Sequence, residues 1–185
     1  MILDIVQYGH PVLRERCAPV TEVTDEIRKL AEDMVETMYD ASGVGLAAPQ
    51  IGRALRLAVV DVAHDPECIS FLKIDGEDVE LSACMPLVFV NPELEFTGEK
   101  EREKEGCLSI QGIQAEVPRP GALKARLEQL DGRVIEVETD GLLARAIQHE
   151  TDHLNGVLFV DRVSPAVKLR LKGKLRQLAK EFQEI

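Results

Sequence analysis

The spacing of apolar residues divides the chain into helical and extended segments. Apolar side chains recur at helical spacing from just after Thr24 to about Asp40, and Thr24 is a suitable N-cap residue. A second helix is expected after residues 140–141, where a run of good helix formers ends at an Asn-Gly pair. Residues 164–185 begin with Ser-Pro and carry one apolar stripe at helical spacing. The sequence therefore predicts an N-terminal, a central and a C-terminal helix.

Extended segments are indicated by short apolar runs and by alternation of apolar and polar residues. Residues 57–62 and 87–90 are continuous apolar runs, and we expect the Asn-Pro pair after the second run to end that strand. Residues 123–130 alternate, and the Asp-Gly pair at 131–132 predicts a two-residue hairpin turn. These signals predict antiparallel sheet directly before the central helix.

Residues 63–85 interrupt this pattern because they are polar and rich in turn-forming residues, so we expect a loop insertion there. A chain of 185 residues is long enough for one domain that buries roughly 70% of the surface of its unfolded form. We expect a single domain, 1–185, of the α+β class. In this domain antiparallel sheets pack around the central helix, and the helix of residues 164–185 closes the chain.

The charge of the chain limits the surfaces that it can offer. With a net charge of −11, the protein is not expected to bind phosphates over its whole surface, since such binding requires clustered Lys and Arg. Basic residues nevertheless crowd the predicted C-terminal helix: Lys168, Arg170, Lys172, Lys174, Arg176 and Lys180. We expect a solvated helix face there, with docking to nucleic acid as the alternative.

No apolar run approaches the length needed to cross a bilayer, and the first residues lack the order of a secretory signal. We therefore expect a soluble, cytoplasmic protein with no membrane partner. The four cysteines show no closely paired spacing, so reduced thiols are expected, and one of them can serve as a metal ligand.

The strongest chemical signal is the sequence QHETDH at residues 148–153, within the predicted central helix. On a helix, His149 and His153 share one face with about 5–6 Å between their Cβ atoms, so both imidazoles can bind one metal ion. Glu150 then lies beside the ion. The alternative is a surface helix with two solvated histidines.

Two histidines do not complete a catalytic metal site, which usually has three protein ligands and one position for water. Spacing alone leaves the third ligand open among Cys107, His10, His64, Cys17 and several carboxylates. Cys107 is favoured because it follows a glycine and is expected at the sheet edge beside the helix. A thiolate would favour a softer metal over Mg²⁺ or Ca²⁺. The alternative for Cys107 is a structural role, because a single cysteine is more commonly a small buried apolar residue.

Three motifs together resemble the signature motifs of the peptide deformylase family, in the same order. They are GVGLAAPQ at residues 43–50, EGCLS at residues 105–109 and QHETDH at residues 148–153. The similarity extends to most of the chain, including the opening at residues 8–14. Two departures are the long segment 63–85 and Thr151, at a position that is more often apolar in the family.

The resemblance implies a small α+β metal hydrolase that removes the N-formyl group from nascent polypeptides beginning with formyl-methionine. Its metal ligands would be Cys107, His149 and His153, with water in the fourth position. One divalent ion is implied, with Fe²⁺ as the physiological metal and Zn²⁺, Ni²⁺ or Co²⁺ as substitutes in preparations.

The resemblance also assigns roles around the ion. Glu150 would act as the acid and base, while the Gln50 amide and the Leu108 backbone N–H would stabilise the developing oxyanion. The remaining motif residues would bind an extended substrate: Gly43, Val44, Gly45 and Gly106. The basic C-terminal helix would be the element that docks transiently on the ribosome.

Two other functions are compatible with the helical histidine pair. A metalloprotease would share the logic of His149, Glu150 and His153, but it would cleave internal peptide bonds and normally take a His or an acidic residue as third ligand. A metal-binding module without catalysis is the other alternative. The presence of both Gln50 and Glu150 argues against it, because a structural metal site needs neither.

Overall fold

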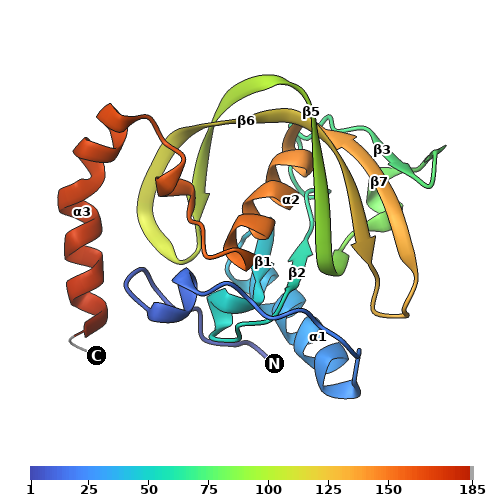
Figure 1. The fold of residues 1–185 in the computed structure, drawn as a ribbon, viewed down its shortest axis with the longest axis horizontal. Helices are drawn as coiled ribbons and strands as arrows, with labels where there is room; N and C mark the ends of the chain where they lie inside the picture. Colours follow the sequence, from blue (N-terminus) through green and yellow to red (C-terminus); the bar gives the residue numbers. More distant parts are fainter. Residues whose placement is uncertain (184–185) are drawn as a thin grey trace.

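The computed structural model describes residues 1–183, in which a curved antiparallel sheet wraps around one central helix (Figure 1). The helices are α1 (Asp25–Asp40), α2 (Gly141–Leu154) and α3 (Pro165–Gln183). The strands are β1 (Gly45–Ala47), β2 (Leu57–Val60), β3 (Leu72–Ile74), β4 (Glu77–Asp78), β5 (Leu87–Cys107), β6 (Ile110–Glu128) and β7 (Val134–Asp140). The predicted α+β class is confirmed, with one sheet of order β1-β2-β5-β6-β7-β3-β4 in place of several.

Helix α2 is the centre of the fold because most of its surface is buried. Leu143, Ala144 and Ile147 have no exposed surface and pack into the main core cluster with side chains from β2, β5, β6 and β7. The chain leaves the helix at Asn155 and Gly156, where glycine has a φ of 73°. Side chains on α2 are therefore held by packing on several sides.

Strand β5 does not end at Asn91-Pro92, so that prediction is wrong. The strand runs from Leu87 to Cys107, with an irregularity in its pairing to β6 between Val90 and Glu93. Asn91 adopts a φ of 49°, and its side chain donates to the carbonyl of Val20 and accepts from the Val20 N–H. The Asn-Pro pair therefore makes a bulge in a long strand, since the side chain of Asn91 ties the bulge to a neighbouring segment.

The turn between β6 and β7 is longer than the two residues predicted. The Gln129 N–H donates to the Arg133 carbonyl at 2.7 Å, so residues 130–132 lie between the bonded ends. Gly132 has a φ of 86°, and Oδ1 of Asp131 accepts from the Arg133 N–H at 3.0 Å. The residue types therefore located the turn but did not give its length.

Residues 63–85 are not entirely loop. They contain β3, which pairs with the outer edge of β7, and the very short β4. Ser70 in the same segment accepts a hydrogen bond from the Leu143 N–H at 3.0 Å, in the first turn of α2. The segment therefore extends the sheet and satisfies one of the free N–H groups at the start of the central helix.

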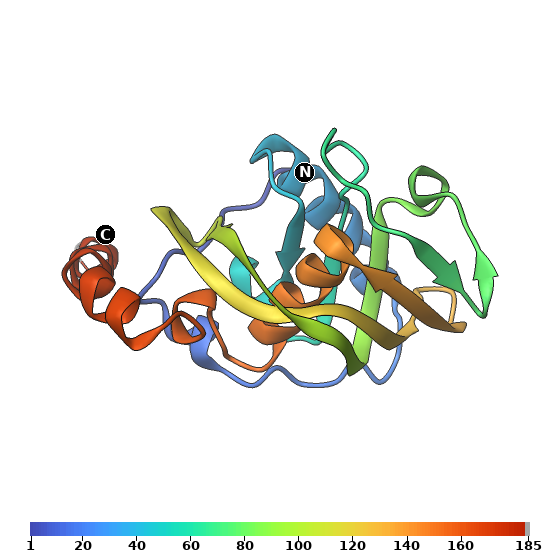
Figure 2. The same ribbon diagram turned by 90° about the horizontal axis from the view of Figure 1, so that it is seen from above.

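The N-terminal and C-terminal helices begin as predicted. Thr24 caps α1 by accepting from the Ile27 N–H, and Ser164 accepts from the Val167 N–H at the start of α3. The apolar stripe of α3 packs on the core through Leu175. Helix α3 and strand β3 lie at opposite ends of the molecule (Figures 1 and 2). None of the described helices combines the length and apolar character that a bilayer crossing requires.

Candidate metal centre

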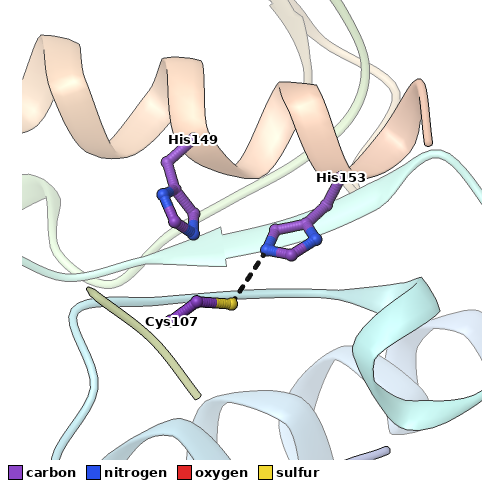
Figure 3. A group of neighbouring side chains, drawn as sticks. All are labelled: Cys107, His149 and His153. Atoms are coloured by element: carbon purple, nitrogen blue, oxygen red, sulfur yellow. Dashed lines mark hydrogen bonds between the residues drawn. The ribbon is translucent and has the colours of Figure 1, made fainter. Parts of the chain in front are cut away.

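The end of β5 and one face of α2 bring a thiol and two imidazoles together (Figure 3). Cys107 is the last residue of β5, and His149 and His153 lie one turn apart on α2. One ligand atom from each of the three residues can be chosen so that all lie within 4.8 Å of one another. Sγ of Cys107 lies 3.4 Å from Nε2 of His153. Among the third ligands that spacing alone left open, Cys107 is thus the one that lies beside both histidines.

These three residues fit one divalent metal ion. Thiolate and imidazole ligands of a tetrahedral ion, at bond lengths of about 2.3 and 2.0 Å, lie about 3.5 Å apart, close to the observed 3.4 Å between Sγ of Cys107 and Nε2 of His153. Among the described residues this is the single group of three such side chains with converging ligand atoms. Three protein ligands leave one position of a tetrahedral ion for water or substrate.

The alternative third ligands lie in other environments. Nδ1 of His10 accepts from the Val12 N–H, and the ring packs against Phe182. His64 is paired with Asp61. Cys17 is buried in the apolar core, where burial raises the pKa of its thiol to about 11. None of the three belongs to the converging group.

Glu150 is buried beside the candidate metal centre, with 4% of its surface exposed. Burial raises the pKa of its carboxyl to about 7, because water no longer solvates the charged form. Its Oε1 lies so close to Gly45 that a Cβ at that position would collide with it. Oε2 has no hydrogen-bond partner among the described residues. The group can therefore exchange a proton near neutral pH with a molecule in the pocket.

Gln50 presents its amide N–H₂ group to the same place. The Ala47 N–H donates to Oε1 of Gln50 at 2.9 Å, which defines the orientation of the amide. Nε2 then lies 3.5 Å from Sγ of Cys107 and 3.2 Å from Oγ of Ser109. Gln50 is 1% exposed, so its donor is held in position before any ligand arrives.

A pocket of about 630 Å³ opens on these groups. Gln50, Cys107, His149 and Glu150 line it. The lining also includes every other residue expected to contact substrate: Gly43, Val44, Gly45, Gly106 and Leu108. A Cβ at Gly43 would lie 2.8 Å from Cδ1 of Leu108, so the glycine permits this close approach. Val44 is 39% exposed at the rim. The predicted substrate-binding residues thus share one cavity with two of the candidate metal ligands, Cys107 and His149.

Sequence reasoning missed the residues that orient the site from behind. Oε1 of Glu105 accepts from Nδ1 of His149 at 2.9 Å, an arrangement that holds a metal-ligating imidazole in one orientation. Burial alone would raise the pKa of Glu105, but its hydrogen bonds from His149 and Arg119 outweigh that effect and lower the pKa to about 2. Glu105 closes a run of charged residues that is typical of a solvated strand. Glu105 is buried because β5 pairs with β6 and packs against α2, and neither contact can be read from the local sequence.

An open Cys-His-His group with a buried glutamate beside it defines the class of the protein as a hydrolytic metalloenzyme. The family model described as polypeptide deformylase matches residues 2–169. The chain belongs to the peptide deformylase family.

Individual relatives agree over nearly the whole length. The chain is 42% identical over 177 residues to the peptide deformylase of Cellvibrio japonicus, covering 95% of each chain. The crystal structure of peptide deformylase from Thermus thermophilus aligns with a TM-score of 0.81 and 36% identity, covering 98% of this chain and 99% of that one. The enzyme from Plasmodium falciparum aligns with the same TM-score at 30% identity, covering 97% of both chains.

Proposed function

We propose that the protein hydrolyses the N-formyl group of nascent polypeptides that begin with formyl-methionine, with formate and a free α-amino group as products. The observation that carries this proposal is the convergence of a thiol and two imidazoles at one point, beside a pocket that Cys107, His149, Gln50 and Glu150 line. These groups would provide what hydrolysis of a formamide needs: metal ligands, a group that transfers the proton, and a donor to the developing oxyanion. Family membership supports the same reaction.

Cys107, His149 and His153 would hold one divalent metal ion. A thiolate ligand suits Fe²⁺, Zn²⁺, Ni²⁺ or Co²⁺ better than Mg²⁺ or Ca²⁺. We propose Fe²⁺ as the physiological metal, with the other three as substitutes in preparations. When bound, such an ion polarises a carbonyl group and makes water acidic enough to act as a nucleophile near neutral pH.

Glu150 would move the proton. Its carboxylate, held against Gly45, takes a proton from the attacking water and later gives it to the nitrogen of the departing amine. Burial raises the pKa of this carboxyl above that of an exposed glutamate, which makes its carboxylate a better proton acceptor. Glu150 is therefore proposed as an acid and base and not as a metal ligand.

Two donors would stabilise the charge that develops on the formyl oxygen: Nε2 of Gln50 and the backbone N–H of Leu108. The backbone of Gly43, Val44 and Gly45, with Gly106 across the pocket, would bind the extended peptide through main-chain hydrogen bonds. Such bonds tolerate varied sequence after the first residue. Methionine would be selected by the apolar part of the pocket.

Release of formate from formyl-Met-Ala-Ser, with and without a chelator, tests the proposal. We expect release that stops with the chelator and returns when the metal is restored. Acetyl-Met-Ala-Ser is the matched control, and we expect little release of acetate. Cleavage of an internal bond in a blocked peptide, with formyl-Met-Ala-Ser left intact, would instead identify a metalloprotease.

We also propose that the enzyme acts in the cytoplasm and docks transiently on the ribosome through α3. Six basic residues of this helix are exposed: Lys168, Arg170, Lys172, Lys174, Arg176 and Lys180. Contacts with RNA phosphates would weaken steeply as salt rises, since each contact releases counterions. Cosedimentation with ribosomes at increasing salt tests this, with a variant that replaces Lys172, Lys174 and Arg176 by Gln as the comparison. No binding, or binding insensitive to salt, would contradict it.

A further inference from the structure

A second face of α2 carries ion pairs that the proposed reaction does not use. Asp152, between the two candidate metal ligands in sequence, lines a pocket of about 330 Å³ that shares no lining residue with the larger one. Its carboxylate accepts from Arg162 through Nε at 2.5 Å and Nη2 at 2.7 Å. It also accepts from Nη1 of Arg119 at 2.8 Å. One carboxylate thus joins two arginines.

These contacts continue inward to the candidate metal centre. Arg119 uses its other two nitrogens, Nε at 2.6 Å and Nη2 at 2.9 Å, to hold both oxygens of Glu105. Glu105 in turn accepts from Nδ1 of His149. The chain of contacts therefore runs from Arg162, whose side chain is 43% exposed, through Asp152 and the buried pair of Arg119 and Glu105 to an imidazole.

We propose that Arg162 is a positioning residue, which acts through Asp152, Arg119 and Glu105 to hold the imidazole of His149 in its metal-binding orientation. The inference rests on the proposed function, since it takes His149 as a ligand. It adds a surface residue, beyond the end of the helix that carries the ligands, to the set that determines metal retention.

The physical reason lies in how the buried charges are paired. Arg119 is buried, and a buried guanidinium that loses an acceptor is costly. Without Arg162, the Asp152 carboxylate keeps one partner and can turn toward water at the second pocket. Arg119 would then lack a well-held acceptor at Nη1 and would shift, taking Glu105 with it. Arg145 also donates to Glu105, at 2.7 Å, so the displacement would be partial.

The two candidate histidine ligands differ in this respect. His149 donates from Nδ1 to a carboxylate, whereas Nδ1 of His153 is buried with no hydrogen-bond partner among the described residues. The ring of His153 is therefore oriented by packing and by the contact of its Nε2 with Sγ of Cys107, with no charged partner behind it at Nδ1. The ion pairs thus orient one specific ligand, His149. Loss of these ion pairs would therefore weaken metal retention more than it would lower the stability of the whole protein.

The test compares Arg162→Gln with Arg14→Gln. Arg14 forms a similar pair with Asp161, the residue before Arg162, and its side chain is 45% exposed, but that pair has no link to Glu105. We would load each protein with Co²⁺ and measure metal release to an excess of chelator, together with the melting temperature. Removing a direct outer partner of a ligand typically costs about 10–100-fold in affinity, so we expect release from Arg162→Gln to be faster by about threefold to tenfold.

The control and the conservative variant complete the comparison. Arg14→Gln should release Co²⁺ at the wild-type rate, even with a similar loss of melting temperature. Arg162→Lys keeps the charge but cannot donate through two parallel nitrogens, so its rate should lie between wild type and Arg162→Gln.

Equal release rates for wild type, Arg162→Gln and Arg162→Lys would overturn the inference while leaving the proposed function intact. Equal acceleration in Arg162→Gln and Arg14→Gln would also overturn it, because it would show a general effect of stability. If the wild-type protein itself does not retain Co²⁺, the proposed ligand set is wrong and the inference fails with it.

Discussion

Gly45 determines how closely β1 can approach the face of α2 that carries Glu150. A Cβ at this position would meet Oε1, Cδ and Cγ of Glu150, which is itself buried and cannot move away freely. The requirement is one of space, because the glycine has no unusual backbone angle. A glycine is therefore required at position 45 of the 43–50 motif because the carboxylate of Glu150, from a distant part of the chain, occupies the space that a Cβ would take.

We predict that Gly45→Ala loses activity while keeping its metal. Displacement of a reacting group by about 1 Å can cost about 10²-fold in rate, so we expect kcat/KM for formyl-Met-Ala-Ser to fall by about that factor. Gly173→Ala is the control, since a Cβ there meets nothing within 4 Å. Activity close to wild type in Gly45→Ala would show that Glu150 does not need its observed position.

Glu150→Gln tests the proton transfer with little change of shape. We expect metal content, measured by elemental analysis, to remain at the wild-type level, because the residue is not a proposed ligand. Turnover should fall by about 10²–10⁴-fold, the usual contribution of a general acid and base. Wild-type turnover in this variant would remove Glu150 from the reaction.

Asp161 gives a pH-dependent contribution to stability away from the metal centre. Burial opposes its ionisation, but hydrogen bonds from Arg14 and the Leu158 N–H outweigh that effect and lower its pKa. In the acidic range the unfolded chain therefore binds more protons than the folded protein, so this contribution rises with pH. It is fully present above the ordinary Asp value of about 3.9 and is lost as pH falls toward the native pKa.

Urea unfolding of wild type and Asp161→Asn between pH 7 and pH 3 measures this contribution. We expect the wild type to be the more stable at neutral pH and the difference to shrink as the pH falls below about 4. A difference that stays constant across this range would mean that the charge of Asp161 does not stabilise the fold.

At the scale of elements, the start of α2 depends on a distant segment. Asp140 stands at the N-cap position, but its side chain makes no capping hydrogen bond and instead accepts from the Phe71 N–H. Ser70, from the 63–85 segment, accepts from the Leu143 N–H in its place. The segment that resembles an insertion thus supports the helix that carries both histidines.

We predict that Ser70→Ala destabilises the protein by about 1 kcal/mol, the usual cost of removing a helix-capping oxygen. Chemical denaturation measures the change. The exposed Ser82, in the same segment, provides the control, and Ser82→Ala should leave stability nearly unchanged. If the two variants are equally stable, the Ser70 contact does not support the helix.

Local signals predicted the elements whose causes are local. Thr24 and Ser164 mark the starts of α1 and α3 because each caps its own helix, and Asn155-Gly156 marks the end of α2 for the same reason. The histidine spacing could be read because one helix turn brings both rings to one face.

Features that depend on distant partners could not be read in this way. Asn91-Pro92 was predicted to end a strand. Hydrogen bonds between Asn91 and Val20 instead hold a bulge at this point, and β5 continues to Cys107. Glu105 is the last residue of a run of charged residues at 99–105, yet it is buried against Arg119, Arg145 and His149. Pairing between remote strands decides such cases, and periodicity does not report it.

At the scale of the whole molecule, the site exists only when three segments meet. Gln50 follows β1, Cys107 ends β5, and the histidines lie on α2, so the long β5–β6 pair must curve over the helix to close the group (Figures 1 and 2). The sheet provides this curvature through pairing irregularities at Val90/Glu93, Thr97/Lys100 and Glu105/Cys107. The last of these sits at the candidate thiolate ligand itself.

The absorption spectrum of the Co²⁺-substituted protein tests most directly whether the thiol and the two imidazoles share one ion. We predict a thiolate-to-metal charge-transfer band in the wild type, its retention in Cys84→Ser and its loss in Cys107→Ser. A wild-type protein that binds Co²⁺ without this band, or a band that survives in Cys107→Ser, would contradict the proposed centre.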